Sequence, residues 1–335
     1  MNNYDEEYEE FEDDSEQIPK KKKFNIFDWY FRDGKGVEGK DINALEKPSV
    51  ANGFKLLWRR LGKLMSANLL FVFGNFPIFF IIIAMSGSLS ETSYAPLSQQ
   101  WGVIKGAMLF DQSPEMSVLV GLYGTKASVS VINTPTIVFF ALGLLIILTL
   151  GFTKIGTTYI YRNIVLGEPI FPFTDFFYII KRNIKRCLIL GIIDALFIGM
   201  FAYNIYFLMS NLSVNTTNAI MLFFTVCMAI IYSFIRNYAY IMAFTFDLPL
   251  KKIIKNAVYF VMLGVKRNLV GLFFSIVVIL LNVVIFLLYI PLGAILPFMI
   301  TLSILGFIGV YAAYPNIDKY MVDHSKDNKS SEEEV

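Results

Sequence analysis

One acidic residue, Asp194, lies inside a long apolar stretch of the sequence, in the run Gly191-Ile-Ile-Asp-Ala-Leu. A charged side chain within a membrane helix is costly, and such residues commonly mark ion or substrate pathways. Asp194 is therefore a candidate for exchanging a proton along such a pathway. The alternative is a structural acid that joins neighbouring helices by hydrogen bonds or faces a water-filled cytoplasmic vestibule.

Asn75 and Pro77 form a second candidate, beside Gly74 and midway along the first apolar segment. Proline lacks a backbone N–H, so we expect the helix to kink or break there. Broken helices at mid-membrane build binding sites in transporters, although kinks also occur in ordinary membrane bundles. The sequence thus predicts a substrate or ion pathway made of Asp194, Asn75 and Pro77, with simple helix packing as the alternative.

Other reaction chemistry has few residues to support it. The single histidine, His324, and the two cysteines, Cys187 and Cys227, are too few for a zinc cluster, a Cys/His nucleophile pair or a disulfide framework. No glycine-rich phosphate loop and no paired catalytic carboxylates lie near the apolar segments. We therefore expect no enzymatic activity, no metal and no cofactor.

The elements that must position these residues are membrane helices. Of the 335 residues 56% are hydrophobic and only 17% are charged, with a mean hydropathy of +0.57, whereas soluble domains are about 45–50% apolar and about 25% charged. Six apolar runs are long enough to cross a bilayer, which takes about 20 helical residues. We predict an all-α polytopic bundle of six transmembrane helices, namely Ser66–Met85, Pro135–Thr153, Cys187–Leu208, Ala219–Phe234 with an extension beyond its apolar core, Leu269–Tyr289 and Ala294–Tyr314.

The basic residues divide sharply between the two sides of this topology. Of the 29 Lys and Arg residues, all but Lys105 and Lys126 fall on the side that holds both termini, with Lys154 counted there because it follows the second apolar run. Positively charged segments stay in the cytoplasm. We therefore predict a bacterial cytoplasmic (inner) membrane protein with both termini inside.

The regions outside the spans differ in character. Residues 1–23, acidic and then basic, and residues 315–335 are expected to be disordered tails. Residues 24–65 form a cytoplasmic juxtamembrane leader whose basic and aromatic residues suit anionic lipid headgroups, and the acidic neighbours oppose nucleic-acid binding. Within the membrane domain, 66–314, residues 87–134 form the one sizeable outer segment, either a cap, a re-entrant piece or a packed loop.

An internal repeat is suggested by the dipeptide Arg-Asn, which recurs at 162–163, 182–183, 236–237 and 267–268. Lys-Arg-Asn opens both the third and the fifth run, which predicts a duplicated helical hairpin. Residues 173–184 and 248–262 are predicted to be amphipathic helices at the inner surface, with an acid near each N-terminus as a cap. These segments supply a candidate cytoplasmic interface made of Asp175, Arg182, Asn183, Asp247, Arg267 and Asn268.

Small and polar residues inside the spans predict helix packing. Gly143, Gly151 and Gly156 allow close approach of a neighbouring helix, and a hinge is the alternative role. Asn204 and Asn282 are expected to form hydrogen bonds between helices, with substrate contact as the alternative.

Three stretches of sequence resemble one membrane protein family. These are Arg59-Arg-Leu-Gly-Lys-Leu-Met-Ser-Ala-Asn-Leu-Leu70 followed by Asn75-Phe-Pro-Ile78, then Gly151-Phe-Thr-Lys-Ile-Gly-Thr-Thr-Tyr-Ile-Tyr-Arg-Asn163, and Asp175-Phe176 with Lys181-Arg-Asn-Ile-Lys185. Together they resemble the YesL-like integral membrane proteins over residues 24–290, and the leader Gly34–Asp41 is similar to that of a clostridial branch. The chain departs from the family by an insertion of about 65 residues after Pro77-Ile78 and by Phe152-Thr153 in place of Gly-Pro.

The resemblance implies a bacterial inner-membrane protein linked with carbohydrate uptake, and it carries over no catalytic or binding residue. We therefore expect an accessory or scaffold protein that contacts lipid and the permease or solute-binding subunits of an uptake system. The alternative is a small secondary transporter or permease that uses Asp194 and the broken first helix.

Overall fold

A computed structural model of the chain describes residues 48–86, 89, 91–96, 99–110, 113–124, 126–131, 133–212 and 215–322. The predicted N-terminal arm, residues 24–47 of the leader and the tail after Val322 lie outside these residues.

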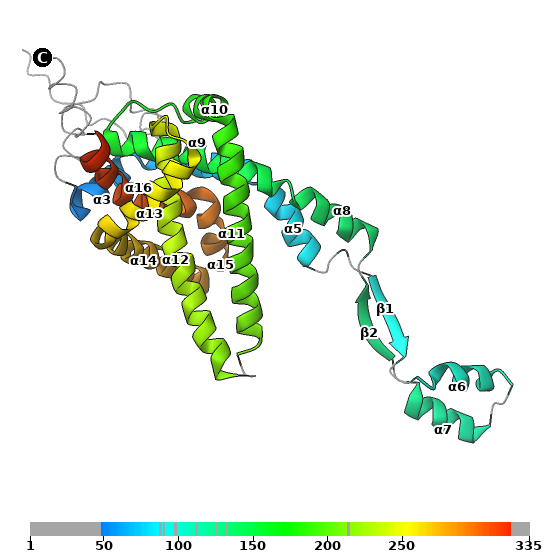
Figure 1. Ribbon diagram of the computed structural model, residues 1–335. Helices are drawn as coiled ribbons and strands as arrows, with labels where there is room; N and C mark the ends of the chain where they lie inside the picture. Colours follow the sequence, from blue (N-terminus) through cyan, green and yellow to red (C-terminus); the bar gives the residue numbers. More distant parts are fainter. Residues whose placement is uncertain are drawn as a thin grey trace, which may run out of the picture.

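The protein is an all-α polytopic bundle with one small two-stranded ribbon (Figure 1). Its elements are α3 (Val50–Arg59), α4 (Leu61–Gly74), α5 (Pro77–Met85), β1 (Glu91–Pro96), α6 (Trp101–Met108), α7 (Pro114–Tyr123), β2 (Lys126–Val131), α8 (Thr134–Gly143), α9 (Ile146–Leu166), α10 (Pro172–Arg182), α11 (Ile184–Ser210), α12 (Thr216–Thr245), α13 (Leu250–Leu263), α14 (Val265–Leu288), α15 (Ile290–Leu296), the π-helix η2 (Pro297–Thr301), α16 (Leu302–Ile317) and the π-helix η3 (Asp318–Val322).

The described helices match the predicted membrane topology. Five of them are long and apolar enough to cross a membrane, namely 134–166, 184–210, 216–245, 265–288 and 290–321. The broken pair α4 and α5 forms a sixth span if it is counted as one. One predicted boundary falls short, because the second span continues past Thr153 to Leu166. The fourth span continues past Phe234 to Thr245, as predicted. The protein is therefore embedded in a membrane.

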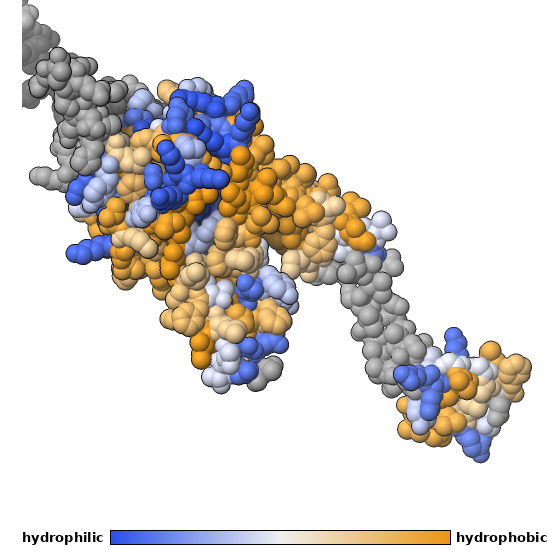
Figure 2. All heavy atoms as spheres, viewed as in Figure 1, coloured by the Kyte–Doolittle hydropathy of each residue, from blue (hydrophilic) through white to orange (hydrophobic). Residues whose placement is uncertain are grey.

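The surface has the pattern that a bilayer requires. Large apolar side chains of α11, α12 and α14 are exposed around the bundle, and Figure 2 shows them as a broad hydrophobic belt. Hydrophilic residues gather over the end of the bundle where α10 lies (Figures 1 and 2). Exposing so much contiguous apolar surface to water would be unfavourable, and in a bilayer the same surface contacts lipid.

The helix α9 is the central element of the bundle. It packs against α4, α10, α11, α12 and α16, and it contributes the largest set of buried residues of any helix, from Gly151 to Val165. Because most of its faces are covered, polar side chains on α9 must find partners inside the protein.

The first span breaks where the sequence predicts. The axes of α4 and α5 differ by 59° across Asn75 and Phe76. Pro77 begins α5, where its missing N–H costs no hydrogen bond. The Asn75 side-chain amide donates to the Phe71 carbonyl over 2.9 Å, beside the backbone N–H of Asn75, which donates to the same carbonyl over 3.1 Å.

The sixth span is also irregular, at the π-helix that starts at Pro297. Asn68 of α4, which is fully buried, binds the backbone there from both ends of its amide. Its Nδ2 donates to the carbonyls of Pro297 and Phe298 over 2.9 and 2.6 Å, and its Oδ1 accepts from the Ser303 N–H over 2.8 Å. The side chain thus joins α4 to the irregular turn and to the start of α16 by three hydrogen bonds.

The predicted duplication is visible in the order of elements. A long helix, a short amphipathic helix and a second long helix occur twice, as α9-α10-α11 and α12-α13-α14. One residue, Asn183 or Gly264, separates the amphipathic helix from the long helix that follows. The register inferred from Lys-Arg-Asn is wrong, however, because Arg267 is the third residue of α14 and its counterpart, the third residue of α11, is Arg186.

The two arginines support this register, because each guanidinium donates to two backbone carbonyls of another span. Arg186 donates to the carbonyls of Ala243 and Phe246 at the end of α12. Arg267 donates to the carbonyls of Tyr311 and Ala312 in α16. The Tyr311 carbonyl needs a donor because Pro315, four residues later inside α16, has no N–H.

The outer segment 87–134 is a projecting arm. Helices α5 and α8 pack against each other, and the antiparallel strands β1 and β2 then extend away from the bundle to the hairpin of α6 and α7 (Figure 1). The strands pair from Glu91 opposite Val131 to Pro96 opposite Lys126. The helical tip is held away from the bundle, so the described residues form neither the predicted cap nor a loop packed on the bundle.

Candidate functional site

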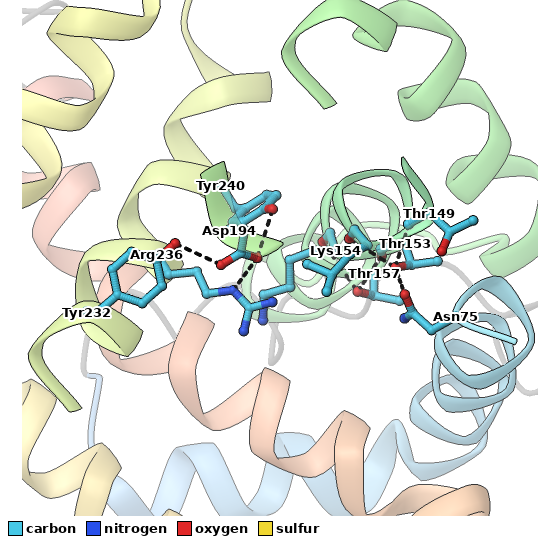
Figure 3. Close-up of polar contacts among 10 residues, drawn as sticks. Asn75, Thr149, Thr153, Lys154, Thr157, Asp194, Tyr232, Arg236 and Tyr240 are labelled. Carbon is cyan, nitrogen blue, oxygen red and sulfur yellow. Dashed lines mark hydrogen bonds and ion pairs between the residues drawn. The ribbon is translucent and has the colours of Figure 1, made fainter. Parts of the chain in front are cut away.

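Asp194 is the centre of a buried polar cluster on α11. Its side chain is only 1% exposed, and its Oδ2 accepts from Arg236 Nε over 2.6 Å and from the Tyr240 hydroxyl over 3.0 Å. Its Oδ1 accepts from the Tyr232 hydroxyl over 3.0 Å (Figure 3). Both carboxylate oxygens are therefore engaged, and the negative charge is balanced by a guanidinium.

The three partners come from one face of α12. Tyr232, Arg236 and Tyr240 follow each other at four-residue intervals, which places them in a row along a helix. The helix α12 packs against α11 across a short connection, so the row faces Asp194. The sequence analysis missed Arg236 because it assigned that residue to a cytoplasmic connection, yet the four-residue spacing is a signal that could have identified it.

Lys154 is a second basic residue that lies inside the bundle, although the sequence pattern predicted a cytoplasmic position for it. It lies on α9, which runs on to Leu166, about 18 Å further along the axis at 1.5 Å per residue. Its side chain extends from α9 toward the Arg236 guanidinium (Figure 3). In the part of the chain that the structure describes, no carboxylate lies within ion-pair distance of Lys154 and no acceptor bonds it.

A cavity of about 340 Å³ adjoins this cluster. Its walls come from α9, α12, α14 and α16, with Phe71 of α4. Its charged and amide groups come from Lys154, Arg236, Asn237 and Asn268. Its hydroxyl groups come from Thr157, Tyr161, Ser233, Tyr238 and Ser275. Asp194 is not part of the lining, because its carboxylate is covered by its three partners.

Asn75 and Pro77 lie on another side of α9 and do not meet Asp194. The Thr153 hydroxyl lies 3.1 Å from Asn75 Oδ1, to which it can donate, and it also lies 3.0 Å from the Thr149 carbonyl (Figure 3). This contact fixes the break of the first span against the central helix. Neither Asn75 nor Pro77 lines the cavity, so the three predicted pathway residues are not brought together.

The glycines behave as helix-packing residues. A methyl group at Gly151 would collide with the backbone of α11 at Cys187 and Gly191, so α9 and α11 cross in close contact there. Gly156 lies under the Phe176 ring of α10, and Gly143 faces Ile81 of α5.

The two asparagines predicted to join helices do not do so. Within the described ranges, no hydrogen bond connects the side chain of Asn204 or Asn282 to another helix, and Asn282 Nδ2 is buried without a partner. Other residues join the spans by polar contacts, among them Asn68, Asn75 and the Asp194 cluster.

The predicted cytoplasmic interface is partly internal, because two of its six residues are buried and only Arg182 and Asp247 are exposed. Asn183 and Asn268 are buried; Asn183 Nδ2 donates to the Ile179 carbonyl, and Asn268 Oδ1 accepts from the Tyr238 hydroxyl. Arg267 is committed to α16, as described above. Arg182 remains exposed.

The two acids predicted to cap helices differ. Asp175 lies in the first turn of α10, and its Oδ2 accepts from the Phe171 N–H over 2.9 Å, as expected of an N-terminal acid. Asp247 precedes α13 and forms an ion pair with Arg186 Nη2 at 3.1 Å, with no cap on α13. The capping prediction is therefore wrong for Asp247.

No three His, Cys, Asp or Glu side chains gather into a metal site among the residues that the structure describes. No family model, no curated protein and no solved structure matches the chain.

Proposed function

We propose that the protein is a non-enzymatic accessory or scaffold component of a carbohydrate uptake system, of the YesL-like type, in the bacterial inner membrane with both termini in the cytoplasm. The basic residues at the α10–α11 and α13–α14 junctions support this orientation, because positively charged ends stay in the cytoplasm. In that orientation the arm projects from the opposite, outer side.

The observation that carries the proposal is the apolar tip of the arm. Phe110 is 93% exposed, and Val103, Leu109, Val118 and Leu122 of the same helical hairpin are also largely exposed. The ribbon β1–β2 holds this hairpin away from the bundle (Figure 1). Exposed apolar clusters on a projecting element are typical of protein contact sites, and a permease or solute-binding subunit is the partner that the family resemblance favours.

The geometry of Asp194 weighs against the transporter alternative. A carboxylate that carries protons must be able to release its partners, whereas Asp194 is held by one guanidinium and two hydroxyls in a buried position. In addition, the broken first helix adds no group to the Asp194 cluster. A structural acid joining α11 and α12 accounts for these contacts.

The test is purification of the tagged protein in mild detergent from its native cells, followed by mass spectrometry of co-purifying membrane proteins. We expect stoichiometric permease or solute-binding subunits with the wild type, and their loss with Leu109→Ser/Phe110→Ser. The matched control is Ile220→Ser/Met221→Ser, which changes two exposed apolar residues of α12 instead of the tip. A wild-type protein that purifies without any such partner would contradict the accessory role.

The alternative is tested by reconstituting the protein in vesicles that contain a pH-sensitive dye and adding sugars across the membrane. We expect no proton movement. Proton flux that Asp194→Asn abolishes would establish the transporter alternative, and partner binding should survive the same substitution if the role is accessory.

A further inference from the structure

Three polar side chains with unused hydrogen-bond donors meet in the cavity between α9, α12, α14 and α16 in the described part of the chain. The Lys154 ammonium has no bonded acceptor among the described residues. Arg236 uses only its Nε to bind Asp194, which leaves both terminal nitrogens free to donate. The Asn237 amide, on the next residue of α12, also lacks a hydrogen-bond partner in the described ranges.

The charges of this cluster do not cancel. Arg236 and Asp194 neutralise each other, so a protonated Lys154 adds one positive charge inside the bundle. A buried charge without a counter-ion costs several kcal/mol. One bound monoanion would remove that cost and supply acceptors for all three groups.

The remaining lining shows what kind of anion fits. Leu272, Leu302, Leu305, Ala312 and Ala313 make much of the wall apolar. Ser233 of α12 and Ile279 of α14 also line the cavity and are exposed at the surface of the bundle. That surface lies within the hydrophobic belt, so the cavity opens sideways toward lipid between α12 and α14.

We propose that this cavity binds a monoanionic amphiphile taken from the bilayer. Its acid group, a carboxylate or a phosphodiester, accepts hydrogen bonds from Lys154, Arg236 and Asn237. Its apolar chain leaves between α12 and α14 into the surrounding lipid. The cavity is at the small end of ligand sites, which are about 300–1,000 Å³, so it holds the acid end of such a molecule and not the whole chain.

Native mass spectrometry of the protein in a nonionic detergent tests the proposal. The purified protein is titrated with oleate, phosphatidylglycerol, phosphatidylcholine, sodium acetate and inorganic phosphate. We compare the wild type with Lys154→Met, which removes the charge, and with Leu272→Trp, which fills the cavity. The control is Lys251→Met, which removes an exposed lysine of α13.

We expect one molecule of oleate or phosphatidylglycerol per chain, with binding weakened at least about tenfold in Lys154→Met and in Leu272→Trp and unchanged in Lys251→Met. Preference for oleate assigns a free fatty acid as the source, and preference for phosphatidylglycerol assigns a lipid headgroup. The wild-type titration is itself decisive, because it does not depend on whether a variant folds.

Three results would overturn the proposal. The first is a wild-type protein that binds neither anionic amphiphile with one-to-one stoichiometry. The second is Lys154→Met binding as tightly as the wild type. The third is equal affinity for phosphatidylcholine, acetate or inorganic phosphate, since the site would then lack selectivity for charge or for an apolar chain.

Discussion

Replacing Arg236 by Met leaves the Asp194 carboxylate buried without its counter-ion. The side chain of Asp194 is 1% exposed and that of Arg236 is 21% exposed, and the pair is joined at 2.6 Å. Removing one partner of a buried ion pair costs about 3–5 kcal/mol. The partial exposure of Arg236 and the two remaining tyrosine donors place this case at the lower limit, about 3 kcal/mol.

This cost converts into a measurable shift of the unfolding temperature. For a domain of 150–250 residues, 1 kcal/mol corresponds to about 2–4 °C, so Arg236→Met should unfold about 6–12 °C below the wild type. The assay follows the reaction of the Cys187 thiol with a fluorogenic maleimide on heating in mild detergent, because Cys187 is fully buried in the folded bundle. Cys227 is replaced by Ser in all proteins, so that a single thiol reports.

The double variant Asp194→Asn/Arg236→Met separates lost charge balance from lost packing. It removes both charges and keeps an amide for the two tyrosines, so we expect it to recover at least half of the loss. Additive effects of the two single substitutions would show that the residues are not coupled. A shift below about 2 °C in Arg236→Met would likewise refute the buried ion pair.

The remaining predictions use the same unfolding assay. Gly151→Ala should destabilise the protein by about 1–3 kcal/mol, because its methyl group meets the backbone of α11. The control Gly199→Ala faces open space and should be neutral or slightly stabilising. Equal effects of the two substitutions would contradict the close crossing of α9 and α11. Asn75→Ala should lower the free energy of unfolding by about 1 kcal/mol, because its hydrogen bond to α9 is lost. Asn204→Ala should have no measurable effect. An unchanged unfolding temperature of Asn75→Ala would show that this residue does not stabilise the broken span. Arg267→Ala should lower the free energy of unfolding by about 1.5–3 kcal/mol, since two carbonyls of α16 lose a charged donor. An unchanged unfolding temperature would show that water replaces the guanidinium there.

Several features of the fold could be read from single segments of the sequence. The break at Pro77 follows from the missing N–H of one residue, and it is present as expected. The glycines at 143, 151 and 156 indicated close helix packing because a residue without a side chain leaves room for a neighbour, whichever neighbour that is. The repeat was also detectable, although its register was wrong, since the position of Arg186 and Arg267 relative to a helix start is known only once the helix boundaries are fixed.

The buried polar cluster around Asp194 could not be predicted from any single segment of the sequence. Asp194 and Arg236 are 42 positions apart, and their contact requires α11 and α12 to face each other with one particular rotation. Lys154 was assigned to the cytoplasm because a local hydropathy window ends at a lysine, whereas the helix continues through it. Lys154 is kept inside by the packing of α9 against its neighbouring helices, which the local sequence does not reveal.

By itself, therefore, the sequence determined that the chain is a multi-pass membrane protein, where its spans lie and where the first of them breaks. Hydropathy, charge and proline geometry are properties of each segment by itself. They can therefore be read along the chain without knowing which segments pack together. Only the tertiary structure decided which charges meet, because pairing depends on helix rotation and on contacts between distant segments. For this reason only the tertiary structure shows that Asp194 belongs to an ion pair and that Lys154 lies at the cavity beside this pair.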